Sequence, residues 1–409
     1  MNILKSSILK RHSIIIFLII LYFPTFWGYV SLGTGQLIYL VATTILTLPF
    51  FYNYKVYKLS LPRISVLFLL WTITYIATLV IQPVINNEII LKDFSDIIRP
   101  FIYLYFFIIG CVFGMRFGKN SFFISALIVT ALLSLVFDGI KFFEQFQTIT
   151  KLYSVFEFGE LNYIRYSGTF GFCYDFGFVA LLIYSISIVF YAKKGLTFIL
   201  GCLIMMLVGS RSVILAFGVI NGLYFFLFSK KQFFKKIILI PVFVLVVVFL
   251  YVIATTWEIP VASDSIRYSE RLVNALSGTD ADGSLGTRNN QLEVAIERFN
   301  KSPIFGVGPS KNDYPIEIQL GYYISSWGIV GTVIFYFIQF NFGIVAVRGI
   351  KSRETIVKYF STANLLWLIS ALIVGMSTPI TDQVRVFQLY YLIQGYQYGI
   401  VKSVIKTSH

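Results

Sequence analysis

The sequence predicts an all-α polytopic membrane protein with about 12 transmembrane helices and two large extracytoplasmic loops that contain short helices. Of its 409 residues, 57% are hydrophobic and only 13% are charged, a balance that excludes a soluble domain of this size. The apolar runs are continuous over about 20 residues and do not alternate, which favours helices over a β-barrel. We therefore expect a single integral membrane domain over residues 1–409.

Apolar runs place the predicted spans along the whole chain. The first run follows basic residues like a signal peptide, but no small-residue cleavage site follows it, so it is kept as a span. Two long connections, 138–172 and 257–321, are the predicted extracytoplasmic loops. The predicted spans are 13–30, 36–52, 62–82, 98–115, 121–137, 173–191, 196–209, 211–229, 237–256, 322–347, 359–376 and 384–402.

The basic residues indicate which side of the membrane each loop faces. With both termini cytoplasmic, the inner loops hold twenty Lys and Arg and a single acid, Glu354. This distribution obeys the positive-inside rule at every inner loop. The formal net charge of +14 is then mainly a topology signal and implies no nucleic acid. Nearly all acids and a set of arginines lie outside, so the active face is expected to be extracytoplasmic.

The longest polar run of the late outer loop, 286–331, leads directly into an apolar segment. Asn290 is expected to cap a short helix, which Pro303 ends, and the sequence GVGP at 306–309 predicts a tight turn. Arg288 would stand at the start of that helix, where a cation opposes the helix dipole unless an anion lies nearby. The predicted apolar face of the helix consists of Leu292, Ala295, Ile296 and Phe299.

Arginines recur where outer loops meet the membrane. Arg211 occupies the tip of a hairpin with almost no loop around it, where an unpaired charge at full depth costs at least about 2.5 kcal/mol. It either snorkels to lipid phosphate or holds an anion. Arg99 and Arg385 lie at the outer ends of two spans. They either form ion pairs, with Asp175 and Asp382 as the candidate partners, or contact substrate.

Arginine suits bidentate contact with phosphate or pyrophosphate oxygens, because its donors form a planar fork. No nucleotide-sugar is supplied at an outer face, so a phosphate-bearing substrate there is expected to be lipid-linked. Tyrosines of both loops, Tyr314 among them, either stack on sugar faces or act as ordinary interfacial residues.

Three segments resemble the superfamily of O-antigen polymerases and O-antigen ligases of bacterial surface polysaccharide assembly. They are RYSGTFGF at 165–172, GSRS at 209–212, and TRNNQLEVAIERFNKSPIFGVG at 287–308 followed by GIVG at 328–331. The resemblance implies glycosyl transfer from an undecaprenyl-pyrophosphate-linked glycan at the bacterial cytoplasmic (inner) membrane, without metal or cofactor. It also implies O-antigen, capsule or exopolysaccharide synthesis and a separate chain-length regulator protein as partner.

The resemblance places Arg165, Arg211 and Arg288 on the family's three arginine positions. Arg211 and Arg288 would neutralise charge on the departing pyrophosphate, and Arg165 would hold a substrate phosphate. Glu317, or in second place Asp313, would accept the proton of the attacking sugar hydroxyl. The alternative for Glu317 is a solvated loop acid or a partner of Lys311.

Two alternatives to a polymerase remain open. Ligases of the superfamily carry a histidine late in the outer loop, and here the only histidines are His12 and His409, which favours the polymerase. A flippase for lipid-linked oligosaccharides also has about a dozen spans. The chain shows no internal repeat and has long loops on one side only, which disfavours a transporter.

Overall fold

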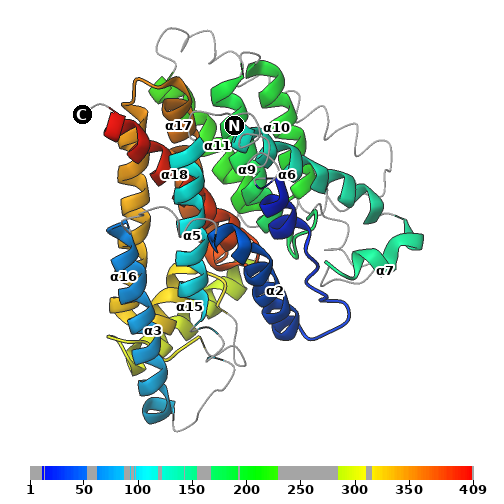
Figure 1. Cartoon of the computed structure of the whole chain (residues 1–409). Coiled ribbons are helices and arrows are strands. Elements are labelled where there is room, and N and C mark those ends of the chain that lie inside the picture. The colour runs from blue at the N-terminus through cyan, green and yellow to red at the C-terminus, as the bar shows by residue number, and fades with distance from the viewer. Residues whose placement is uncertain are drawn as a thin grey trace.

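The computed structural model describes residues 12, 14–52, 62–86, 93, 96, 98–117, 122–141, 143–153, 167–191, 194–228, 284–309 and 316–407. All regular structure in these ranges is helical, which confirms the predicted fold class. The long helices are α2 (Leu32–Tyr52), α3 (Ile64–Asn86), α5 (Ile98–Phe117), α6 (Phe122–Lys141), α9 (Cys173–Phe190), α10 (Lys194–Val208), α11 (Arg211–Phe228), α16 (Gln319–Ile350), α17 (Thr355–Gly375) and α18 (Val386–Thr407) (Figure 1). The short helices are η2 (Glu144–Phe146), α7 (Gln147–Thr150), α15 (Ser284–Lys301) and η3 (Ile380–Asp382).

The chain is a multi-pass membrane protein. Five helices are long and apolar enough to cross a membrane, namely Ile64–Ile85, Ile98–Arg116, Cys173–Phe190, Gln319–Ile350 and Thr355–Gly375, and four shorter apolar helices accompany them in the described ranges. Every predicted span except 237–256 falls on a helix, and 237–256 lies outside the described residues.

The first predicted span, 13–30, is too long. The helix ends at residue 22, and Pro24 follows, which lacks an N–H and disfavours helical backbone in the preceding residue. Phe26, with φ +58°, then turns the chain before α2.

Helix α18 lies at the centre of the bundle and packs most extensively against α5 (Figure 1). Two glycine pairs at i, i+4 spacing make this close approach possible: Gly110 with Gly114 on α5, and Gly395 with Gly399 on α18. A Cβ at any of the four would overlap backbone atoms of the facing helix. Small residues at this spacing are the usual means by which membrane helices bring their backbones together.

The central position of α18 explains why its sequence is more polar than that of the spans around it. From residue 386 to 400 only Tyr398 is less than fully buried, so the glutamines of α18 face protein instead of lipid. Gln388 donates to Thr43 of α2 at 2.8 Å, and Asn364 of α17 donates to Gln394 at 2.9 Å. These interhelical hydrogen bonds satisfy polar groups that lipid would leave unpaired.

Candidate functional site

The GVGP turn (306–309) fills a break in α16. Gly328 has φ +59° and interrupts the helix, and Gly306 in the turn has φ +75°. Together with Pro303 and Ile304 just before it, the turn supplies the partners that the broken helix ends lack. Four backbone hydrogen bonds join the two segments. The N–H groups of Val307 and Gly308 donate to the carbonyls of Ser325 and Ser326, both at 3.0 Å. The N–H groups of Ile329 and Val330 donate to the carbonyls of Pro303 (2.9 Å) and Ile304 (3.2 Å). The two glycine segments of the sequence are thus one structural unit.

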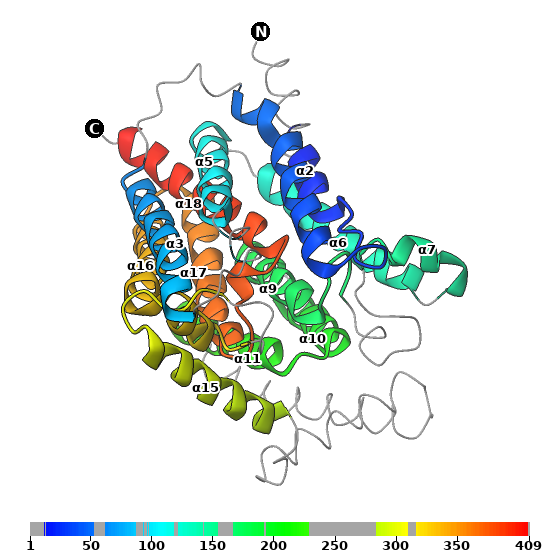
Figure 2. The ribbon, with the colours of Figure 1, turned by 90° about the horizontal axis from the view of Figure 1, so that it is seen from below.

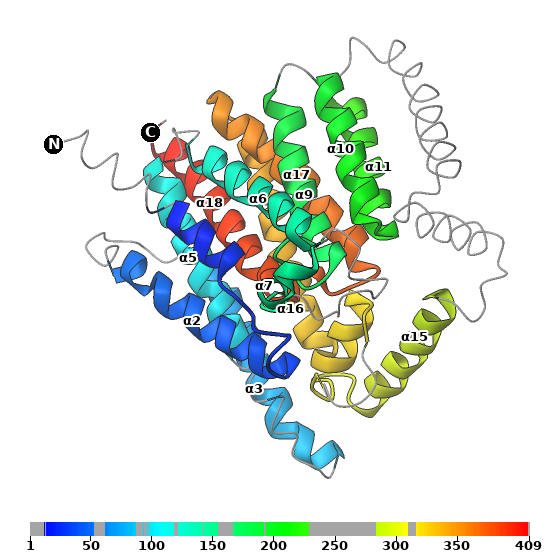
Figure 3. The same ribbon diagram turned by 90° about the vertical axis from the view of Figure 1, so that its right-hand side faces the viewer.

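Helix α15 lies at the lower end of the bundle beside the beginning of α16 (Figures 1 and 3). It begins at Ser284, so the predicted cap at Asn290 is wrong and Arg288 lies in the second turn. Asn290 lies inside the helix, and the next residue, Gln291, docks on the segment before α16. The Gln291 side chain is 2% exposed, and its Oε1 accepts the N–H of Glu317 at 3.1 Å.

The predicted apolar face of α15 does not pack as a unit against the protein. Ala295 is 1% exposed and faces Gly321, whereas Leu292 and Ile296 are 44% and 51% exposed. Exposed apolar residues on one side of a charged helix are what a helix at a membrane surface presents to lipid. Seen along the bundle, α15 forms the outermost helix of its side (Figure 2).

A chain of contacts connects the α10–α11 hairpin tip with α15. Ser212, next to Arg211, accepts a hydrogen bond from Ser377 at 2.7 Å. The adjacent Thr378 side chain and Glu317 both lie within electrostatic range of the Tyr174 hydroxyl. Since Glu317 in turn bonds Gln291, and Arg288 stands one helical turn before Gln291, five separate segments meet here.

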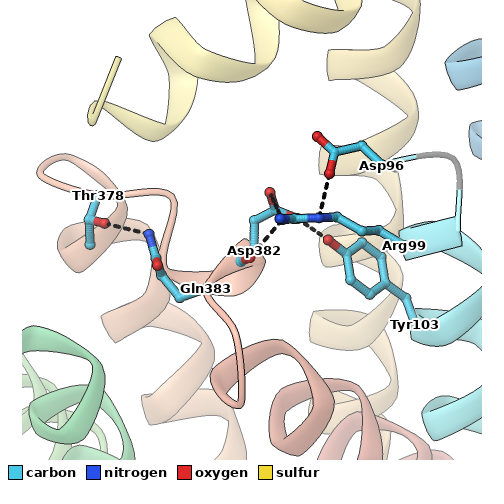
Figure 4. Close-up of polar contacts among 6 residues, drawn as sticks. All are labelled: Asp96, Arg99, Tyr103, Thr378, Asp382 and Gln383. Atoms are coloured by element: carbon cyan, nitrogen blue, oxygen red, sulfur yellow. Dashed lines mark hydrogen bonds and ion pairs between the residues drawn. The ribbon is translucent and has the colours of Figure 1, made fainter. Parts of the chain in front are cut away.

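Arg99 is the centre of a buried ion-pair cluster (Figure 4). Its Nε lies 2.8 Å from Asp96 and its Nη1 lies 2.9 Å from Asp382 in the loop after α17, while the Tyr103 hydroxyl donates to the other oxygen of Asp382. Asp382, one of the two candidate partners, therefore pairs with Arg99. Burial raises the pKa of Asp382 to about 7, Arg99 opposes this rise and Asp96 adds to it.

Arg385 is also buried, with 1% exposure and φ +70°. Its Nη2 donates to the Phe23 carbonyl at 2.6 Å, and its guanidinium lies over the rings of Tyr39 and Tyr153 at 5.1 and 5.0 Å. Asp175 is close enough to interact electrostatically with Arg385. Among the described residues, however, no ion pair joins these two side chains. Arg385 thus ties the start of α18 to the turn before α2. Substrate contact by Arg99 or Arg385 stays a prediction.

The other predicted site residues are placed only in part. Arg211 is the first residue of α11, and the described structure includes its backbone only. Arg288 is half-buried and Glu317 is exposed. Arg165, Asp313 and Tyr314 lie outside the described residues.

A groove of about 750 Å³ runs between α16 and α17 and ends close to Glu317 and Asp382. Gln319, two residues after Glu317, and Thr381, next to Asp382, line one end of it, and Arg348 lines the other. Between these ends the lining residues are almost entirely apolar.

Comparison with known families decides the assignment. Residues 196–332 match the model of the O-antigen ligase family, and the match extends from α10 through α15 to the break in α16. This match supports membership of the O-antigen polymerase and ligase superfamily. The match supports a glycosyltransferase-like function of the polymerase or ligase type in polysaccharide biosynthesis. No curated protein matches the sequence.

Sequence reasoning missed the residues that join the superfamily's segments. Tyr174 and Thr378 had the appearance of ordinary residues at helix ends, and Gln291 had no distinguishing spacing. The available signal was polarity inside apolar sequence, because Gln339 interrupts a span that lipid would otherwise surround.

Proposed function

We propose that the chain is a polysaccharide polymerase. It transfers a growing undecaprenyl-pyrophosphate-linked glycan onto an undecaprenyl-pyrophosphate-linked repeat unit at the outer face of the cytoplasmic membrane. The support is the chain of contacts from Ser212 through Ser377, Thr378 and Tyr174 to Glu317 and Gln291, which brings the two superfamily segments that carry Arg211 and Arg288 to one side of the bundle.

In the proposed reaction, a hydroxyl oxygen of the acceptor sugar attacks the anomeric carbon of the donor. The bond from that carbon to the pyrophosphate oxygen breaks, and its electron pair stays with the pyrophosphate. Arg211 and Arg288 stabilise the charge that develops there, as fixed cations can in a partly dry site. Glu317 accepts the proton of the attacking hydroxyl as general base. Arg165, with Asp313 and Tyr314, contacts the donor or acceptor.

The choice of polymerase over ligase depends on the acceptor. The superfamily's ligases carry a histidine late in the outer loop, and the corresponding stretch here, 311–327, contains none. Glu317 is the acid that stands near that position. The acceptor is then a second lipid-linked repeat unit.

Deletion of the gene tests the proposal directly. Loss of a polymerase leaves single repeat units at the cell surface, loss of a ligase leaves polymer on its lipid carrier, and loss of a flippase leaves no surface glycan. Complementation with Arg211→Lys, Arg288→Lys or Glu317→Gln should give single units in place of long chains on a gel. Arg298→Lys on the same helix as Arg288 is the matched control, and normal chain lengths in both site arginine variants contradict the scheme.

A further inference from the structure

The groove between α16 and α17 has one regular wall. Tyr336, Gln339, Phe340, Gly343 and Val347 follow one another at the helical spacing that keeps them on one face of α16. From Tyr336 to Arg348 this wall rises by about 18 Å, given 1.5 Å per residue. The opposite wall is formed by α17 around Leu368 and Leu372.

The groove opens away from the interior of the bundle. Phe340 and Leu372 in its lining are 63% and 53% exposed. At Gly343 an added Cβ would meet no atom within 4 Å, so empty space begins at the helix backbone itself. Both walls belong to helices long and apolar enough to cross a membrane, so hydrocarbon is what surrounds this opening.

One end of the groove is polar and incompletely bonded. Gln319 and Thr381 are 3% and 1% exposed, and Gln319 Oε1 and Thr381 Oγ1 form no hydrogen bond, nor does Gln339 Nε2 beside them. Buried polar atoms normally have partners, so these mark a place where a further polar group approaches. This end adjoins Glu317, and the apolar part leads away from it.

We propose that the α16–α17 groove binds the isoprenoid chain of a lipid-linked substrate, with the headgroup end of that chain at Gln319 and Thr381. This assignment rests on the proposed function, because it places the chain beside Glu317. Length favours an isoprenoid over a phospholipid. The hydrocarbon core is about 30 Å thick, so an acyl chain held in one leaflet covers about 15 Å, less than the wall from Tyr336 to Arg348.

The test uses the full-length protein in lipid nanodiscs and a long-chain isoprenoid diphosphate with a photoreactive diazirine at its far end. We expect the probe to label α16 and α17 between Gly343 and Arg348, and unlabelled long-chain isoprenoid diphosphate to displace it. Gly343→Leu projects a side chain into the groove from a position where a Cβ meets no atom within 4 Å, and it should lower labelling at least about tenfold, since several chain carbons lose their contacts. Gly218→Leu on α11, another glycine with no atom within 4 Å of its Cβ position, should leave labelling unchanged.

Thermal unfolding of both variants shows whether they fold. If Gly343→Leu does not, Gly343→Ala should lower labelling about twofold on the same grounds. Three results contradict the groove assignment: unchanged labelling in a folded Gly343 variant, equal labelling by a diazirine phospholipid that the isoprenoid does not displace, or no labelling because other parts of the chain cover Gly343.

A transfer assay separates this inference from the proposed function. The assay uses lipid-linked repeat units as substrates. If the wild-type protein forms polymer while the probe labels other helices, only the groove assignment is contradicted. If labelling depends on Gly343 but no transfer between lipid-linked units occurs, the polymerase proposal is contradicted and the groove assignment stands. If both hold, Gly343→Leu should raise KM for a long-chain substrate relative to KM for an analogue with two isoprene units.

Discussion

Gly306 and Gly328 pack backbone against backbone, so closely that a Cβ on Gly328 would lie 2.6 Å from the nitrogen of Gly306. The first belongs to the turn after α15 and the second to the break in α16. Each also has a positive φ that other residues adopt only at a cost. The contact explains why a G-hydrophobic-G turn and a GIVG segment occur together in this sequence.

Alanine at either glycine should therefore destabilise the protein. Left-handed backbone costs an alanine about 1–2 kcal/mol, and the overlap of its Cβ with the facing backbone adds to this, for a total of about 2–4 kcal/mol. Thermal unfolding in detergent measures the loss. Gly218→Ala on α11, where φ is ordinary and no atom lies within 4 Å, is the control, and equal melting temperatures for all three variants would contradict the role of the contact.

The sequence was sufficient to predict the helices and the turn at 306–309, because hydropathy, glycine and proline act locally. It also named Asp382 among the candidate ion-pair partners of Arg99 and Arg385, but not which arginine it meets. It was not sufficient for relationships between distant segments. Nothing local shows that Gly306 meets Gly328, that Gln291 reaches Glu317, or that Arg385 lies over two tyrosine rings. The start of α15 was misplaced at Asn290 because the residues before this local cap signal are also helical.

The glycines between α5 and α18 make a second stability prediction. Gly395→Leu places a side chain against the Phe107 carbonyl of α5 and should force the helices apart. Because α18 is the central helix, we expect loss of folded protein, measured as the monodisperse fraction after detergent extraction. Gly222→Leu on α11, a position with no neighbour within 4 Å, should extract like wild type. A normal yield of Gly395→Leu would show that the helix contact tolerates separation.

The buried carboxyl of Asp382 predicts a pH dependence of stability. Its pKa rises from 3.8 to about 7 in the folded protein, chiefly through burial. A raised pKa means that the folded state favours the neutral carboxyl, so this contribution to stability is present below about pH 4 and is lost as pH rises to about 7. The melting temperature of wild type minus that of Asp382→Asn should fall between these values and be flat above pH 8. A difference that grows with pH would contradict the sign.

The hydrogen bond from Glu317 N–H to Gln291 Oε1 yields a prediction about activity. Gln291→Met keeps the size of the side chain but removes the acceptor, which leaves a partly buried N–H unpaired at a cost of about 1–3 kcal/mol. If Glu317 is the general base, a looser backbone at that residue should lower kcat about tenfold and change KM little, because positioning matters most in the transition state.

Asn290→Met is the matched control for that variant. Asn290 precedes Gln291 on the same helix, and its side chain is exposed, so the substitution should change neither kcat nor melting temperature. Transfer between lipid-linked units in nanodiscs gives both kinetic constants. A fall in melting temperature for Gln291→Met with kcat unchanged would show that the bond only holds α15 in place, and Glu317 would then lose its assigned role, because a general base displaced from its position cannot leave turnover intact.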